Sequence, residues 1–139
     1  MKILKSFGLF AIVLTSFTFA AQAQTPPPTV ESVAPVVTKT TPQAGDTNVA
    51  PGITEIKVTF SKDMTDNLWS WSSAWQNSTP ESIGKPKYEA DRRTCVLKVK
   101  LEPGKTYGYW INSQKFHGFQ DSHGQAAVPY LLVFKTKEK

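Results

Sequence analysis

The sequence contains little cysteine, little histidine and no motif of a known catalytic centre. Its one cysteine, Cys95, excludes an intramolecular disulfide, so the fold must depend on its own hydrophobic core. The nucleophile elbow G-x-S-x-G, the zinc motif H-E-x-x-H and a phosphate-binding glycine loop are all missing, and the carboxylates are isolated. We therefore predict that the protein is not an enzyme and that it carries no cofactor.

Charge of one sign is also scarce. The 139 residues include 16 Lys+Arg and 11 Asp+Glu, which is a formal net charge of +5 at pH 7. Two of the basic residues, Lys2 and Lys5, belong to an N-terminal leader, so the net charge falls from +5 to +3 without it. The other basic residues are scattered, which is not typical of a nucleic-acid-binding surface. We expect no nucleic-acid partner.

Long apolar stretches are confined to the N-terminus. Residues 1–23 combine the two lysines with an apolar segment at 7–20 and an A-x-A cleavage site at 21–23. Glycine, threonine and serine interrupt the apolar segment, which is also short for a membrane span. We predict a signal peptide that is cleaved after Ala23, a secreted or periplasmic location, and no membrane span after cleavage.

The rest of the chain is long enough for one domain. Residues 24–35 contain four prolines and almost no large apolar side chain, which predicts a flexible tether that is partly polyproline II. Residues 36–139 form the predicted domain. We expect it to be a monomer.

Residues 36–139 show the period-two alternation of β-strands between turn residues, with no capped amphipathic helix. Seven short strands are expected, at residues 36–41, 55–60, 68–72, 85–90, 94–101, 106–112 and 129–136. The pattern breaks down at 61–86, where we expect irregular structure or a brief helical turn around Trp71 to Trp75. So many short strands favour an all-β sandwich of two sheets.

The alternation also predicts which side chains form the core. The expected core residues are Ile56, Val58, Phe60, Tyr88, Cys95, Leu97, Val99, Leu101, Tyr107, Tyr109, Ile111, Leu132 and Phe134. Cys95 lies on the apolar side of its alternating run, so we expect a buried and inert thiol.

Several stretches together resemble bacterial immunoglobulin-like (Ig-like) domains of the SbsA type. They are TPQAGDTNVAP at 41–51, IKVTFSKDM at 56–64, LEPGKTY at 101–107, FQDSHG at 119–124 and FKT at 134–136. The resemblance implies an extracellular or periplasmic Ig-like sandwich that acts as a spacer, an adhesive module or a partner-binding module.

Individual residues of these motifs have expected structural roles. Pro103 and Gly104 suit a type II turn, because glycine accepts the positive φ at its second central position. Tyr107 is placed like a tyrosine corner, whose hydroxyl bonds to nearby backbone. Met64 would fill space beneath a loop.

Four residues form the predicted ligand site: Trp75, Trp110, Asn112 and His117. Trp110 lies opposite Tyr109 in the alternation and should point away from the core. Trp75, in the long 61–86 segment, could fold back over the same face. For both indoles, core packing and a binding platform remain open, whereas Trp69 and Trp71 fit core or loop packing. The expected partner is an envelope protein or a glycan.

A metal site is the alternative. His117, Asp121 and His123 lie within seven residues, and Asp121-Ser122-His123 is similar to the Asp-x-His stretch of exported copper-binding domains of the CopC type. That family also uses a histidine at the mature N-terminus, where this chain has Gln24. A passive structural spacer is a further alternative.

Overall fold

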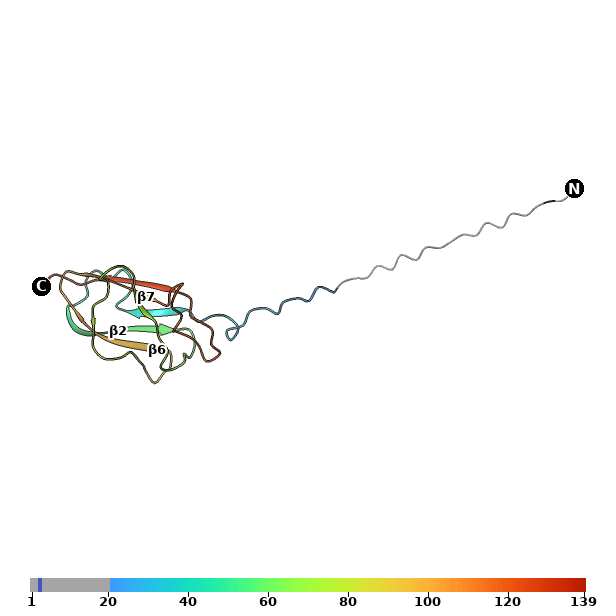
Figure 1. Ribbon diagram of the computed structural model, residues 1–139, viewed down its shortest axis with the longest axis horizontal. Helices are drawn as coiled ribbons and strands as arrows, with labels where there is room; N and C mark the ends of the chain where they lie inside the picture. The colour runs from blue at the N-terminus through green and yellow to red at the C-terminus, as the bar shows by residue number, and fades with distance from the viewer. Residues whose placement is uncertain (1–2, 4–20) are drawn as a thin grey trace.

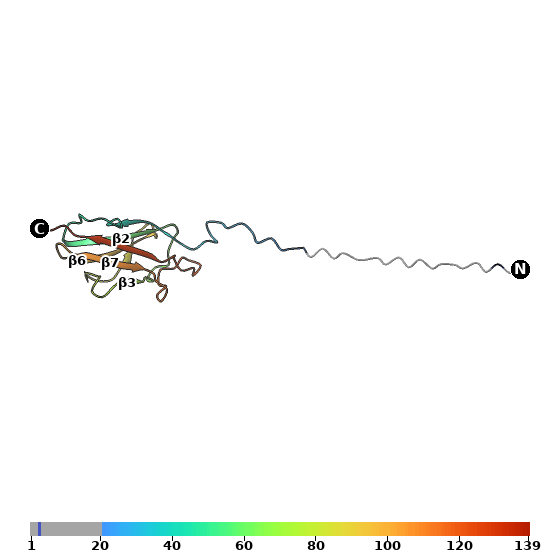
Figure 2. The ribbon, with the colours of Figure 1, turned by 90° about the horizontal axis from the view of Figure 1, so that it is seen from above.

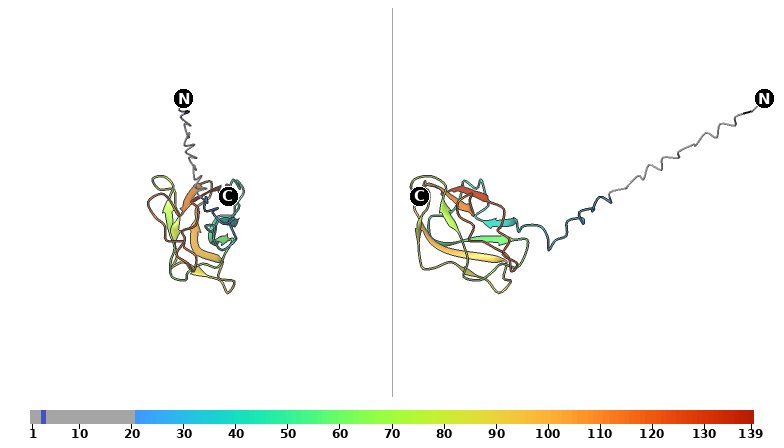
Figure 3. Two further views of the ribbon diagram at one scale, coloured as in Figure 1. Left: turned by 90° about the vertical axis from the view of Figure 1, so that its right-hand side faces the viewer. Right: turned by 45° about the vertical axis from the view of Figure 1, so that its right-hand side comes forward.

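In the computed structural model, which describes Ile3 and residues 21–139, eight strands form two antiparallel sheets and no helix is present. The predicted signal peptide falls largely on residues outside this range. Within Ile3 and residues 21–139, nothing has the length and hydropathy of a transmembrane helix. Residues 21–30 extend away from the sheets (Figures 1 and 2, and the right-hand view of Figure 3).

The larger sheet has the order β1-β2-β6-β4, and β5 also pairs with β6. Its strands are β1 (Val37–Thr41), β2 (Gly52–Phe60), β4 (Glu81–Ser82), β5 (Lys87–Tyr88) and β6 (Thr94–Leu101). The long strands β2 and β6 lie side by side at its centre (Figure 1). β5 and β6 correspond to the strands expected at 85–90 and 94–101, and they pair antiparallel.

The smaller sheet has the order β3-β7-β8. Its strands are β3 (Trp71–Ser73), β7 (Thr106–Ile111) and β8 (Tyr130–Lys135). The two sheets confirm the predicted all-β Ig-like sandwich, with one strand more than expected because the sequence pattern did not reveal β4.

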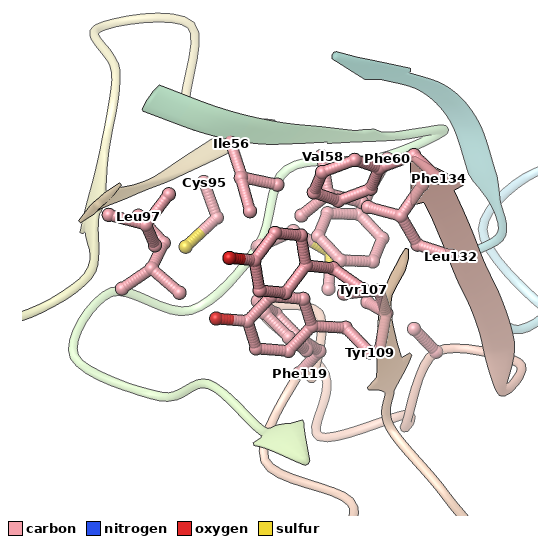
Figure 4. Close-up of a cluster of buried hydrophobic side chains, with 14 of the residues drawn as sticks. Ile56, Val58, Phe60, Cys95, Leu97, Tyr107, Tyr109, Phe119, Leu132 and Phe134 are labelled. Carbon is pink, nitrogen blue, oxygen red and sulfur yellow. The ribbon is translucent and has the colours of Figure 1, made fainter. Parts of the chain in front are cut away.

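The core lies between the two sheets. Every predicted core residue is buried except Tyr88, which packs half-buried against the others. Figure 4 shows side chains from both sheets meeting in this space, including Ile56 and Val58 of β2 and Tyr107 and Tyr109 of β7. Phe119 and Met64, which lie outside the strands, are also buried. Loop side chains therefore complete a core that the strand pattern mostly predicts.

Two local predictions at the start of β7 are confirmed. Gly104 has a φ of +66°, which suits the second central position of the expected turn. The Tyr107 hydroxyl accepts a hydrogen bond of 2.8 Å from the Glu102 backbone N–H, so Tyr107 forms the tyrosine corner.

The helical turn expected around Trp71 to Trp75 is wrong. Residues 71–73 are extended and pair with β7, because alternating tryptophan and serine place one indole against the core and one hydroxyl outside. A tight turn follows, in which the Ser78 N–H donates to the Trp75 carbonyl at 3.1 Å.

Candidate functional site

The outer face of the β3-β7-β8 sheet carries Trp110. Its neighbours Tyr109 and Ile111 are buried, whereas Trp110 is partly exposed. Directly opposite residues of paired antiparallel strands share a face, so Ser72 of β3 and Leu131 of β8 lie on either side of Trp110. Leu131 is 41% exposed. The middle of this face is therefore apolar and accessible.

Trp75 lies on the same face. A Cβ atom at Gly108 would stand only 2.2 Å from the Trp75 ring, so the indole covers the bare backbone of that glycine. Gly108 and Trp110 are two positions apart on β7 and point to the same side of the sheet. Trp75 remains 44% exposed. A glycine is needed at 108 because any side chain would displace the tryptophan.

Buried Ser78 holds the Trp75 turn in place. Its hydroxyl accepts hydrogen bonds from the backbone N–H groups of Ala74, at 2.9 Å, and Trp75, at 3.2 Å. The same hydroxyl donates to the Gly108 carbonyl at 2.7 Å. The turn is thus fastened to the strand that Trp75 covers, and the exposed indole is preorganised.

A hollow of about 400 Å³ lies at the end of this face. It is lined by Trp110, Ser113, Gln114, Lys115 and Pro129. Trp110 supplies an aromatic wall, and the 113–115 loop supplies polar groups. This mixture of apolar surface with a few polar groups is common in ligand sites.

Asn112 does not belong to this surface, which corrects its assignment to the ligand site. The side chain is fully buried. Its Nδ2 donates to the carbonyls of Phe119, at 2.9 Å, and Ala127, at 3.0 Å, and its Oδ1 accepts the Phe119 N–H at 2.9 Å. Strand alternation misplaces the residue because β7 ends at Ile111 and Asn112 has a φ of +55°. Asn112 instead holds the loop that follows.

His117 is exposed in the loop after β7. Its backbone carbonyl accepts a hydrogen bond from the Gln120 side chain at 2.9 Å. The imidazole is not part of the lining of the Trp110 hollow. Its role as a ligand-binding residue stays a prediction.

Asp121 of the predicted metal alternative is already engaged by other groups of the protein. One carboxylate oxygen accepts hydrogen bonds of 2.9 Å from the backbone N–H groups of His123 and Gln125. The other accepts a hydrogen bond of 2.9 Å from the Lys62 ammonium. Burial favours a higher pKa for Asp121, but these hydrogen bonds outweigh it and hold the pKa below its usual value. Within residues 3 and 21–139, no three His, Cys, Asp or Glu side chains lie close enough together to hold a metal ion. His117, Asp121 and His123 therefore do not converge on one point.

Lys62 also attaches the N-terminal segment to the domain. Its ammonium donates to the Glu31 carbonyl and to the Gln125 side-chain oxygen, each at 3.0 Å. The Gln125 amide in turn donates to the Ser32 carbonyl at 3.0 Å. The part of the expected tether from Glu31 onward is therefore bound to the sandwich.

Cys95 lies on β6 and is buried in the core, as expected. Burial raises the pKa of its thiol to about 12, so the thiolate that would act as a nucleophile is not populated near neutral pH. The inert role predicted for Cys95 agrees with this environment.

The sequence analysis missed two contributors to the accessible surface, Leu131 and Phe116. Both residues are at least two-fifths exposed. Leu131 could have been predicted. β8 has apolar residues at both odd and even positions, and one of these two sets must point away from the core. Phe116 lies in the loop after β7, where strand alternation no longer predicts which way a side chain points.

Comparison with known proteins identifies the fold. A sequence profile of the family described as Bacterial Ig-like domain matches residues 31–136. Among solved structures, that of surface layer protein SbsC, domains 1–6, is similar, with a TM-score of 0.50 and 18% sequence identity. The match covers 77% of this chain and 14% of that one, so this chain spans a small part of the relative. No curated protein sequence matches.

Proposed function

The chain belongs to the bacterial Ig-like domain family, and from this premise we propose that it is a non-enzymatic interaction module of the cell envelope. It binds a protein or glycan partner through the outer face of the β3-β7-β8 sheet. The accessible residues Trp75, Trp110 and Leu131 form the centre of that surface, which we call the aromatic face.

The near absence of charge on this sheet carries the proposal. Lys135, at the end of β8, is the one charged residue in β3, β7 and β8. Exposed apolar surface of this kind marks interaction sites in soluble proteins, and tryptophan is enriched where proteins bind partners. The buried anchoring of Ser78 supports the same role, since a preorganised indole loses little entropy on binding.

The location rests on two further observations. The predicted signal peptide implies export. The solved relative is a surface layer protein by its title. Both support an envelope location for this chain.

A passive spacer is the second candidate, favoured by the position of the chain ends. The N-terminal segment leaves one end of the domain and the C-terminus lies at the other (Figures 1 and 2). This arrangement suits a module that links other domains in a row.

Affinity capture on the exported chain separates the two candidates. A partner from envelope extract should bind the wild-type protein and should be lost from a Trp75→Ala/Trp110→Ala variant. The matched control is Lys39→Ala/Lys98→Ala, which changes two exposed residues on the outer face of the other sheet and should keep the partner. Equal capture by all three proteins would reject the aromatic face as the site. Capture by none would favour the spacer.

A further inference from the structure

A second hollow opens at the side of the sandwich, next to the aromatic face. It has a volume of about 530 Å³ and lies between β3 of one sheet and the β4–β5 edge of the other. It is lined by Trp69, Ser70, Trp71, Ser72, Ser73, Ser82, Gly84, Pro86, Leu97 and Phe116. We call it the side cleft.

The side cleft exists because β6 has two short neighbours, β4 and β5, in place of one continuous edge strand. β4 pairs with β6 at Val99 and Lys100, whereas β5 pairs at Cys95 and Val96. Between them the chain turns outward at Gly84, whose φ is +78°. Leu97 lies opposite this break and forms an apolar floor.

The walls carry aromatic rings and hydroxyl groups but no charge. None of the ten lining residues is ionisable near neutral pH. Phe116 is 50% exposed, and the Lys115 ammonium lies 5.2 Å from its ring centre. Lys115 lines the Trp110 hollow and Phe116 lines the side cleft, so this loop contributes to both hollows.

The hydroxyl groups lie along both walls. The Oγ atoms of Ser70 and Ser72 are 3.5 Å apart on the β3 side, and Ser82 lies across from them on β4. The buried Tyr109 hydroxyl lies close to Ser82 and adds a further polar group on this side. A serine hydroxyl both donates and accepts, so this row matches a ligand that is itself rich in hydroxyl groups.

We propose that the side cleft binds a neutral saccharide. The C–H faces of a sugar ring pack against aromatic side chains, and its hydroxyls pair with serine hydroxyls. A phosphate or an acidic sugar would need a basic residue in the lining, and a cation would need a carboxylate. An added peptide strand is less suited, because three-residue β3 is too short an edge to hold a strand in register. The side cleft shares Ser72 with the aromatic face, but the rest of its lining is separate.

Titration of the isotope-labelled exported chain, followed by amide NMR shifts, tests this proposal. The probes are the neutral hexasaccharides cellohexaose, maltohexaose and chitohexaose, with a hexamer of galacturonic acid as the charged comparison. At least one neutral probe should shift the amides of residues 70–73 and 82–84. Phe116→Ala should weaken that binding by roughly tenfold, about the loss of one good ring contact. Ile53→Ala, at an exposed apolar residue of β2 outside both the cleft and the aromatic face, is the matched control and should bind normally.

The remaining outcomes overturn the proposal. No shift with any neutral hexamer at about 10 mM, the weak end of measurable affinity, would do so, as would stronger binding of the acidic hexamer. A short uncharged peptide that shifts β3 when the sugars do not would assign the cleft to strand addition. Shifts confined to Trp110 and Leu131 would reject the side cleft and leave the function proposed for the aromatic face standing.

Discussion

The outer faces of the two sheets differ in chemistry although they cover the same core. On the larger sheet, Glu55 and Lys57 of β2 lie beside Lys98 and Lys100 of β6. Lys57 also forms an ion pair of 2.6 Å with Glu89. The aromatic face of the smaller sheet has tryptophan, leucine and serine in the equivalent positions. Both patterns satisfy strand alternation, so a β-sandwich leaves the chemistry of its outer faces free for function.

The difference also bears on solubility. Lysines on the larger sheet keep one side of the molecule well hydrated and discourage pairing between molecules. The smaller sheet needs a different protection, which short β3 and the covering Trp75 turn provide in part. The domain is thus asymmetric, with one face suited to water and the other to a partner.

The largest effect is expected from removing an aromatic ring from the core that both sheets share, because this should destabilise the whole domain. Phe60 packs against Phe119 with ring centres 5.0 Å apart and is almost fully buried. Phe60→Ala should lower the free energy of unfolding by about 3–5 kcal/mol, the usual cost of deleting a buried aromatic ring. Urea denaturation followed by fluorescence measures it. Leu131→Ala, on the aromatic face, is the control and should cost far less; equal losses would contradict the described core.

The next largest effect is expected at Lys62, which faces buried Asp121. Lys62→Met leaves that carboxylate without its cation and should cost about 3 kcal/mol at pH 7. The pKa of Asp121 is lower in the folded protein than its ordinary value of 3.8, so its contribution to stability is present above that pH and lost as the pH falls below it.

Denaturation midpoints between pH 7 and pH 2 test this prediction. The wild-type protein should lose more stability than Lys62→Met as the pH falls. The control is Lys57→Met, whose ion pair with Glu89 is exposed to solvent and should contribute little to stability. Parallel pH profiles for wild type and Lys62→Met would show that the ion pair does not stabilise the fold.

A smaller change would alter only the aromatic face. Gly108→Ala places a methyl group against the Trp75 ring and should cost about 1–3 kcal/mol through overpacking. Acrylamide quenching should show a more accessible indole, because Trp75 must move outward. In the double variant Gly108→Ala/Trp75→Ala the cost of the methyl group should largely disappear, which a double-mutant cycle measures. Strict additivity would mean that the two residues do not interact.

The smallest effect on stability should come from placing a lysine on the aromatic face, which would then resemble the outer face of the larger sheet. Leu131→Lys adds a charge beside Trp110 and should change the free energy of unfolding by less than about 0.5 kcal/mol, since the side chain is exposed. Partner capture should nevertheless be lost, because a lysine on the aromatic face must be desolvated on binding. Lys98→Leu, the reverse change on β6, should leave capture unaffected.

Local pattern was sufficient for most of the fold. Alternation placed Ile56, Val58 and Leu97 in the core, and the position of Tyr107 after a turn predicted a hydrogen bond between its hydroxyl and nearby backbone, which the structure shows at Glu102. These predictions succeeded because each depends on neighbours within a few residues. The two-residue strand β4 was missed because a segment that short has no periodicity.

The candidate sites depended on longer-range relations. The sequence by itself determined that Trp110 points away from the core, since alternation within one strand decides the direction of a side chain. Only the tertiary structure decided that Trp75 covers Gly108, that the Asn112 side chain is buried and hydrogen-bonded to the following loop, and that Asp121 is paired with Lys62. Each of these contacts joins segments that no local pattern relates, because their proximity follows from the packing of the two sheets and the paths of the loops between them.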